Sequence, residues 1–195
     1  MKTKQINLLK QVKYFLLIVV LSFMACKQDK TEIVQETETK TEVKAPKIKL
    51  QEAILAGNRQ AVQQHIKAGS DLNEKDVFSG ATPLITAITF DKTDIAKELI
   101  VAGSDLSIKN NDGSTALHVA AFFCRVEVVK MLLDAGADKM VKNNFEATPR
   151  ETVMGPFDEI KPFYEMMQQQ LSPLGLNLDL AEIEKTRPVI AMMLQ

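Results

Sequence analysis

Apolar residues recur at helical spacing through the middle of the chain. The clearest example is the apolar stripe over residues 128–133, which predicts an amphipathic helix with one buried face. Before it, Ala120 and Ala121 are small enough to let two helices approach closely. A weaker version of the same pattern begins at Leu50. The pattern predicts an all-α fold built from pairs of short helices.

Two sets of landmarks show that the helix pairs repeat with a fixed period. The glycines that end each second helix are Gly69, Gly103 and Gly136, and the threonines that open each first helix are Thr82, Thr115 and Thr148. The glycines are 34 and 33 residues apart and the threonines 33 and 33. The extra residue therefore lies in the turn that carries Val77 and Phe78. A period near 33 is the spacing of one class of helical repeat.

The stretch from Asn111 to Asp138 resembles an ankyrin repeat, because Thr115, Leu117 and His118 match three positions of its Thr-Pro-Leu-His opening. The resemblance implies an ankyrin-repeat solenoid, in which helix-turn-helix units are joined by turn fingers. It also implies that His118 hydrogen-bonds neighbouring turns. From the residues themselves we expect Thr115 to cap its helix, Pro83 to occupy a first helical position and Gly136 to adopt a positive φ.

The two ends of the predicted array, residues 47–154, depart from the repeat. The first unit lacks the Thr-Pro-Leu opening and suits a capping role, whereas the last begins at Thr148 and loses the pattern after Pro149. Residues 155–195 are predicted to form two helices that cover the open end. The first is expected over 159–171, capped by Asp158, and the second from 180 towards 194, opened by Asp179 and kinked or split at Pro188. The inward residues expected on the first are Ile160, Phe163, Met166, Met167 and Leu171.

The N-terminal segment reads as an export signal. Residues 1–25 combine four lysines and no acid with the apolar run 14–24, which is typical of a signal peptide. Ala25 followed by Cys26 resembles a bacterial lipobox, which implies cleavage before Cys26 and its lipidation. The expected location is the bacterial cell envelope, where the protein would be anchored to a membrane and face the periplasm or the cell exterior. The alternative is an uncleaved anchor in which Cys26 is incidental.

Residues 26–46 are expected to be a disordered tether that follows the lipidated cysteine. The stretch 27–46 contains no aromatic residue and is rich in Thr, Glu and Lys. Such a composition buries too little apolar area to offset the entropy of ordering. Its simplest role is to hold the folded part away from a lipid surface.

Charge and motif content exclude several classes of function. The four lysines of the signal segment leave the remaining chain mildly acidic, which argues against nucleic acid as a partner. The two histidines, His65 and His118, share no helical spacing, so we expect no metal site and no cofactor. No catalytic motif is present, and we expect a non-catalytic monomer.

The family resemblance places the binding surface for a protein partner on the concave side, which is formed by the fingers and the first helix of each unit. Exposed aromatic residues in such a groove are plausible binding anchors. Two adjacent phenylalanines cannot both face one helix–helix core, so we expect at least one of Phe122 and Phe123 to be exposed or semi-exposed. The alternative is that Phe122 packs between repeats and Phe123 against a neighbouring finger. The candidate residues are Phe78, Phe90, Lys109, Asn111, Phe122, Phe123, Arg125 and Phe145.

A second hypothesis concerns Cys124, which stands where the family usually has glycine. Arg125 follows it, and a positive neighbour can lower the pKa of a thiol. The chain would then be a redox-responsive or chaperone-like accessory factor of an envelope enzyme.

Overall fold

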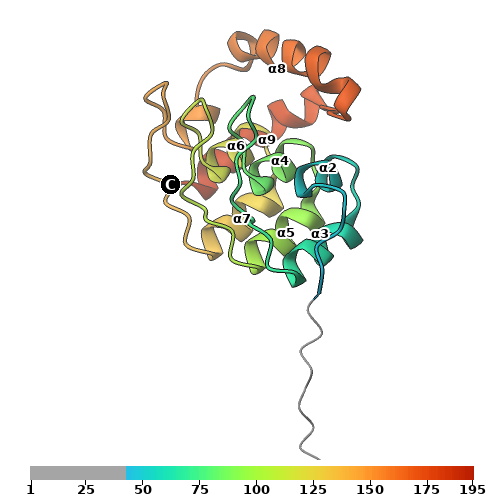
Figure 1. The fold of residues 1–195 in the computed structure, drawn as a ribbon. Coiled ribbons are helices and arrows are strands. Elements are labelled where there is room, and N and C mark those ends of the chain that lie inside the picture. Colours follow the sequence, from blue (N-terminus) through green and yellow to red (C-terminus); the bar gives the residue numbers. More distant parts are fainter. Residues whose placement is uncertain (1–42) are drawn as a thin grey trace, which may run out of the picture. The chain divides into compact units, whose positions relative to one another are not determined.

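The computed structural model describes residues 43–195, and within them all secondary structure is helical (Figure 1). The predictions for residues 1–25, for Cys26 and for most of the tether lie outside these residues. Three helix pairs follow one another along the chain. They are α2 (Leu50–Leu55) with α3 (Arg59–Lys67), α4 (Pro83–Thr89) with α5 (Thr93–Val101), and α6 (Ala116–Phe122) with α7 (Val126–Asp134).

The C-terminal part begins as a fourth repeat and then leaves the pattern. The first helix of that unit is reduced to the 3-10 turn η1 (Glu151–Val153). The elements that follow are α8 (Phe157–Leu171), η2 (Ser172–Leu174) and α9 (Leu180–Met193). Within residues 43–195, no helix is long and apolar enough to cross a bilayer.

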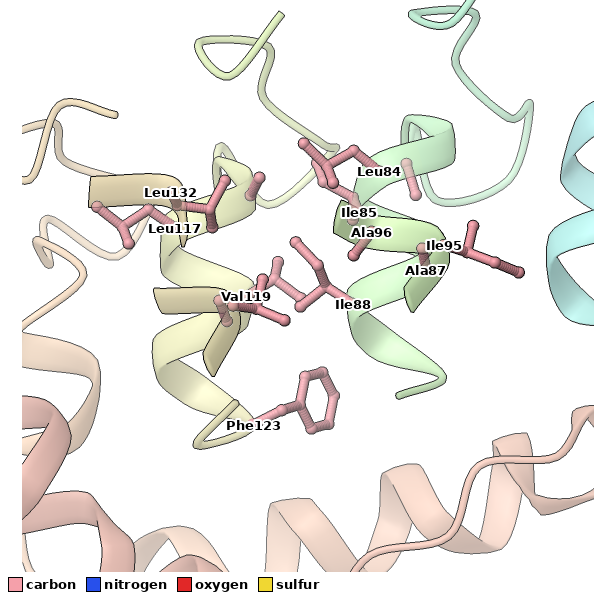
Figure 2. Close-up of a cluster of buried hydrophobic side chains, with 14 of the residues drawn as sticks. Leu84, Ile85, Ala87, Ile88, Ile95, Ala96, Leu117, Val119, Phe123 and Leu132 are labelled. Carbon is pink, nitrogen blue, oxygen red and sulfur yellow. The ribbon is translucent and has the colours of Figure 1, made fainter. Parts of the chain in front are cut away.

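The helix pairs stack into two rows. An inner row consists of α2, α4 and α6, and an outer row of α3, α5 and α7 (Figure 1). Figure 2 shows the core between two adjacent pairs, where Leu84 and Ile88 of α4 approach Leu117 and Val119 of α6. No single pair can bury its apolar stripe alone, so each unit depends on its neighbours.

Local signals start and end the helices as the sequence predicts. Thr82 caps α4 by accepting a hydrogen bond from the amide of Ile85, and Pro83 takes the first helical position. Thr115 and His118 form a capping box at the start of α6. Gly136 follows α7 with a φ of 83°, which a residue with a Cβ rarely adopts.

The loops between helix pairs form three fingers, over residues 70–81, 104–114 and 137–147. Each finger contains a tight turn whose first side chain accepts backbone hydrogen bonds across the turn: Asp76 from Ala81, Asn110 from Ser114 and Asn143 from Ala147. The first of these turns is one residue longer than the other two. This confirms that the extra residue lies beside Val77 and Phe78.

Hydrogen bonds join each finger to the one before it. The side-chain amide of Asn111 donates to the carbonyl of Phe78 at 2.8 Å, and 33 residues later Asn144 donates to the carbonyl of Asn111 at 3.0 Å. Glycine is required beside these contacts. A Cβ on Gly80 or Gly113 would lie 2.4 or 2.3 Å from the Oδ1 of the next asparagine.

Helix α9 closes the C-terminal end of the stack by packing against α7 and η1. Asp179 caps it, as predicted, through the amide of Glu182 at 3.0 Å. Of the two predicted outcomes at Pro188, the split does not occur, because α9 runs through that residue as one helix, and the kink stays a prediction. The packing of α9 on its neighbours compensates for the one backbone hydrogen bond that proline removes.

Helix α8 differs from its prediction in where it begins and in what it buries. It starts at Phe157 after Pro156, so Asp158 lies inside the first turn and is not the cap. Its one fully buried side chain is Tyr164, which the sequence analysis did not place inward. Phe163 and Met166, expected to be inward, are 44 % and 42 % exposed. Ile160, Met167 and Leu171, which were also expected to be inward, are partly buried against the core, in agreement with the prediction.

The finger contacts lead to a stability prediction. Gly113→Ala is expected to lower the free energy of unfolding by about 2–3 kcal/mol, because the added Cβ meets Asn144 and the position has a positive φ. Gly136→Ala is the matched control, since φ is also positive but nothing lies within 4 Å, and its expected cost is about 1 kcal/mol. Urea denaturation followed by circular dichroism measures both. Equal losses would show that the finger contact contributes nothing.

Candidate functional site

The tips of the first and third fingers expose large apolar side chains. Phe78 is 90 % exposed and Phe145 is 74 % exposed, in agreement with their prediction as surface residues. Val77 and Met140 on the same two fingers are also exposed, although the sequence analysis did not single them out. Their apolar character within otherwise polar loops is the signal that would have identified them. Exposed apolar residues at loop tips are available to a partner without any rearrangement.

The middle finger presents polar groups that are already used inside the array. Lys109 donates to the carbonyl of Lys142 on the next finger at 2.9 Å, and the side-chain amide of Asn111 donates to the carbonyl of Phe78 on the finger before. Both side chains remain exposed at the surface. Their first role is therefore to join fingers, and a partner would meet them in a fixed position.

The two adjacent phenylalanines lie in different environments, although their rings meet edge-on with centroids 5.2 Å apart. Phe123 is 3 % exposed, and Figure 2 shows it pointing from the end of α6 towards α4. Its prediction as a surface anchor is wrong, because it fills the space between two inner helices. Phe122 is half-buried, as is Phe90 at the end of α4. One of the pair is therefore semi-exposed and the other is buried.

Helix α8 covers Phe122. The ring of Tyr164 stacks on that of Phe122 with centroids 4.5 Å apart, and Phe163 meets it edge-on at 5.8 Å. The Tyr164 hydroxyl donates to the main-chain carbonyl of Phe122 at 2.6 Å and lies 3.5 Å from a nitrogen of Arg187. Burial raises the pKa of Tyr164, so the hydroxyl stays protonated and remains a donor. The C-terminal segment therefore occupies the predicted binding surface at the last complete repeat.

Arg125 is engaged by the array and does not present a free charge. Its guanidinium pairs with Asp91 of the preceding repeat at 3.1 Å and lies over the ring of Phe123 at 5.9 Å. Burial lowers the pKa of Arg125, and the charge of Asp91 opposes this shift. The side chain is therefore largely held between two repeats, and its role in binding a partner stays a prediction.

The environment of Cys124 does not favour the redox hypothesis. Burial raises the pKa of its thiol to about 11, and this outweighs the opposite effects of Arg187 and Arg125. The sulfur lies 3.6 Å from the carbonyl of Ile183 on α9. A thiol in this state is protonated near neutral pH and is a poor nucleophile. The residue has a φ of 54°, as does the equivalent Asp91, where glycine would be unstrained.

The two histidines have structural partners. His118 accepts from the amide of Thr115 through Nδ1 at 3.2 Å, so its Nε2 donates to the carbonyl of Ala147 on the next finger at 3.0 Å. Burial lowers its pKa and keeps the ring neutral. His65 contacts Ser70 and the carbonyl of Ile48. In the part of the chain that the structure describes, no three His, Cys, Asp or Glu residues are grouped as a metal site requires.

Comparison with known proteins agrees with this geometry. The family model of ankyrin repeats matches residues 50–143 in three copies. This segment is an array of ankyrin repeats. The hydrogen bond from His118 to the next finger is the one that the family resemblance implied.

Two curated relatives and one solved structure are similar to parts of the chain. Protein phosphatase 1 regulatory subunit 27 from Homo sapiens and the same subunit from Mus musculus are each 41 % identical over 64 residues, which is 33 % of this chain and 41 % of theirs. The crystal structure of the ankyrin repeat domain of Bcl-3, described as a unique member of the IkappaB protein family, has a TM-score of 0.51 at 29 % identity. That match covers 53 % of this chain and 45 % of the other. The chain thus spans less than half the length of these relatives.

The contact between Tyr164 and Phe122 can be tested by mutation. Tyr164→Phe is expected to cost about 1–2 kcal/mol of unfolding free energy, because the Phe122 carbonyl loses its partner. Tyr164→Ala is expected to cost about 3–5 kcal/mol, as for other large buried aromatics. Met166→Ala on the same helix is the control and is expected to change little, since that side chain is exposed. Similar losses in Tyr164→Ala and Met166→Ala would mean that α8 is not held by Tyr164.

The pKa of Cys124 predicts slow alkylation. With Cys124 as the sole thiol in a Cys26→Ser chain, its rate with iodoacetamide at pH 8 is expected to be about 100-fold or more below that of free cysteine. Mass spectrometry of timed samples measures the rate, and the unfolded chain in urea serves as the reference. A rate equal to the reference would restore the redox hypothesis.

Proposed function

We propose that this protein is a non-catalytic interaction module that binds a protein partner through its fingers and the open part of its inner helix row. The observation that carries the proposal is the pair of aromatic fingertips, Phe78 and Phe145, on fingers that are both hydrogen-bonded to the middle finger between them. Large apolar side chains on a fixed backbone can bind a partner without rearrangement of the array.

The family and the relatives support a protein as the partner. Ankyrin repeats are characteristically protein-binding units, and the two curated relatives are named as regulatory subunits of protein phosphatase 1. Helix α8 lies over Phe122 in the third unit, so the partner is expected to contact the inner helices of the first two units and the fingertips. The contact surface then runs from Phe78 to Phe145 and excludes Phe123.

The proposal includes a lipid anchor at Cys26 in a bacterial cell envelope. Its support is the sequence of residues 1–26, in which lysines, an apolar run, Ala25 and Cys26 follow in the order of a lipoprotein signal. Acylation of Cys26 by two or more chains would hold the protein stably at a membrane surface. The array would then meet its partner close to the membrane.

Site-specific crosslinking tests the binding surface. A photoreactive residue in place of Phe78 or Phe145 is expected to form the same adduct with one protein when the full chain is expressed in cells. Val101 on the outer row is the matched control, since its side chain is 81 % exposed but lies on the opposite row. Adducts that form equally well at Val101, or only there, would reject the finger surface.

The anchor has its own test. Cys26→Ser is expected to move the protein from the membrane fraction to the soluble fraction and to leave the signal segment uncleaved or cleaved elsewhere. Fractionation with mass measurement of the N-terminal peptide follows both effects. Cys124→Ser is the matched control and is expected to change neither. Unchanged partitioning and processing in Cys26→Ser would contradict the anchor, without bearing on the finger surface.

A further inference from the structure

A pocket lies between η1 and α9, and none of its lining residues belongs to a finger. Its volume is about 460 Å³, within the range of about 300–1,000 Å³ typical of small-molecule sites. The lining residues that matter for its chemistry are Arg150, Met154, Phe157, Glu184, Arg187 and Met192. The proposed function uses none of them.

Arg187 places a buried positive charge in the wall of the pocket. The residue is 4 % exposed, and one guanidinium nitrogen donates to the carbonyl of Gly155 at 2.9 Å. Another lies 3.5 Å from the Tyr164 hydroxyl, and the ring of Phe157 lies 6.0 Å from the guanidinium. All these partners are neutral, and among residues 43–195 no acid forms an ion pair with Arg187. A buried charge without a counter-charge is costly, so this wall favours an anion.

Arg150 supplies a second guanidinium to the lining of the pocket. Its Nε donates to the carbonyl of Ala191 on α9 at 3.2 Å, which fixes the orientation of the group. Its terminal nitrogens have no hydrogen-bond or ion-pair partner within the described residues. A guanidinium held in this way matches the two oxygens of a carboxylate.

The other lining residues determine the net charge of the pocket and the polarity of the ligand that fits it. Glu184 contributes one negative charge and pairs with neither arginine, so the charged side chains that line the pocket sum to a single positive charge. Met154 and Met192 are exposed at the rim, and Phe157 lies deeper. A singly charged head with an apolar body complements this lining better than a phosphate dianion does.

We propose that this pocket binds a small carboxylic acid with an apolar tail. The carboxylate accepts hydrogen bonds from the terminal nitrogens of Arg150 in the field of Arg187, and the tail contacts Met154, Phe157 and Met192. The site is independent of the finger surface, so either proposal can fail without the other.

Calorimetric titration of the full chain with hexanoate, at constant ionic strength and pH 7, tests the site. Saturable binding is expected, and hexan-1-ol, which lacks the charge, is expected to bind at least about tenfold more weakly. Inorganic phosphate, which lacks the tail, is also expected to bind more weakly. Absence of saturable hexanoate binding would overturn the proposal, as would equal binding of hexanoate and hexan-1-ol or of hexanoate and phosphate.

Three variants locate the binding within the pocket. Arg150→Gln is expected to weaken hexanoate about tenfold, whereas Glu184→Gln is expected to strengthen it a few-fold by removing a like charge. Lys97→Gln removes an exposed positive charge from α5 and is expected to leave the affinity unchanged. Circular dichroism confirms that each variant is folded. Unchanged affinity in Arg150→Gln, or the same change in Lys97→Gln, would place hexanoate outside this pocket.

Discussion

Hydrogen bonds between consecutive fingers hold the repeats in register. Asn111 and Asn144 each reach the carbonyl of the finger before, and His118 reaches the carbonyl of the finger after. The apolar core between the helix pairs supplies most of the burial, but apolar contact has little directional preference. Directional hydrogen bonds, repeated at nearly the same spacing as the helices, fix how far one unit is translated relative to the next. The position of every fingertip follows from them.

The repeat pattern predicted the part of the fold in which each signal is local. Caps at Thr82 and Asp179, the positive φ of Gly136 and the helix pairs all depend on residues a few positions apart, so they can be derived without knowing the rest of the structure. The contact of His118 with the next finger was implied by the family resemblance. The extra residue beside Phe78 was located by counting the period alone.

The features that the sequence did not predict depend on contacts between residues that are far apart in the sequence. Whether Phe122 or Phe123 faces inward is settled by α4 on one side and by Tyr164, 42 residues later, on the other. The thiol of Cys124 is buried against α9, and that burial outweighs the neighbouring positive charge that the sequence makes visible. On α8, Ile160, Met167 and Leu171 pack against the core as the apolar stripe predicted, whereas the buried Tyr164 and its hydrogen bond to the Phe122 carbonyl were not predicted.

The stacking of one finger on the next has a consequence for how such a chain changes in length. Each finger is hydrogen-bonded only to its immediate neighbours, so a complete unit inserted in the middle would restore every bond that it interrupts. An addition after α7 has no such compensation, because α9 covers the face on which a new helix pair would stack. The array can therefore grow by duplication of its interior, while its C-terminal end sets where growth stops.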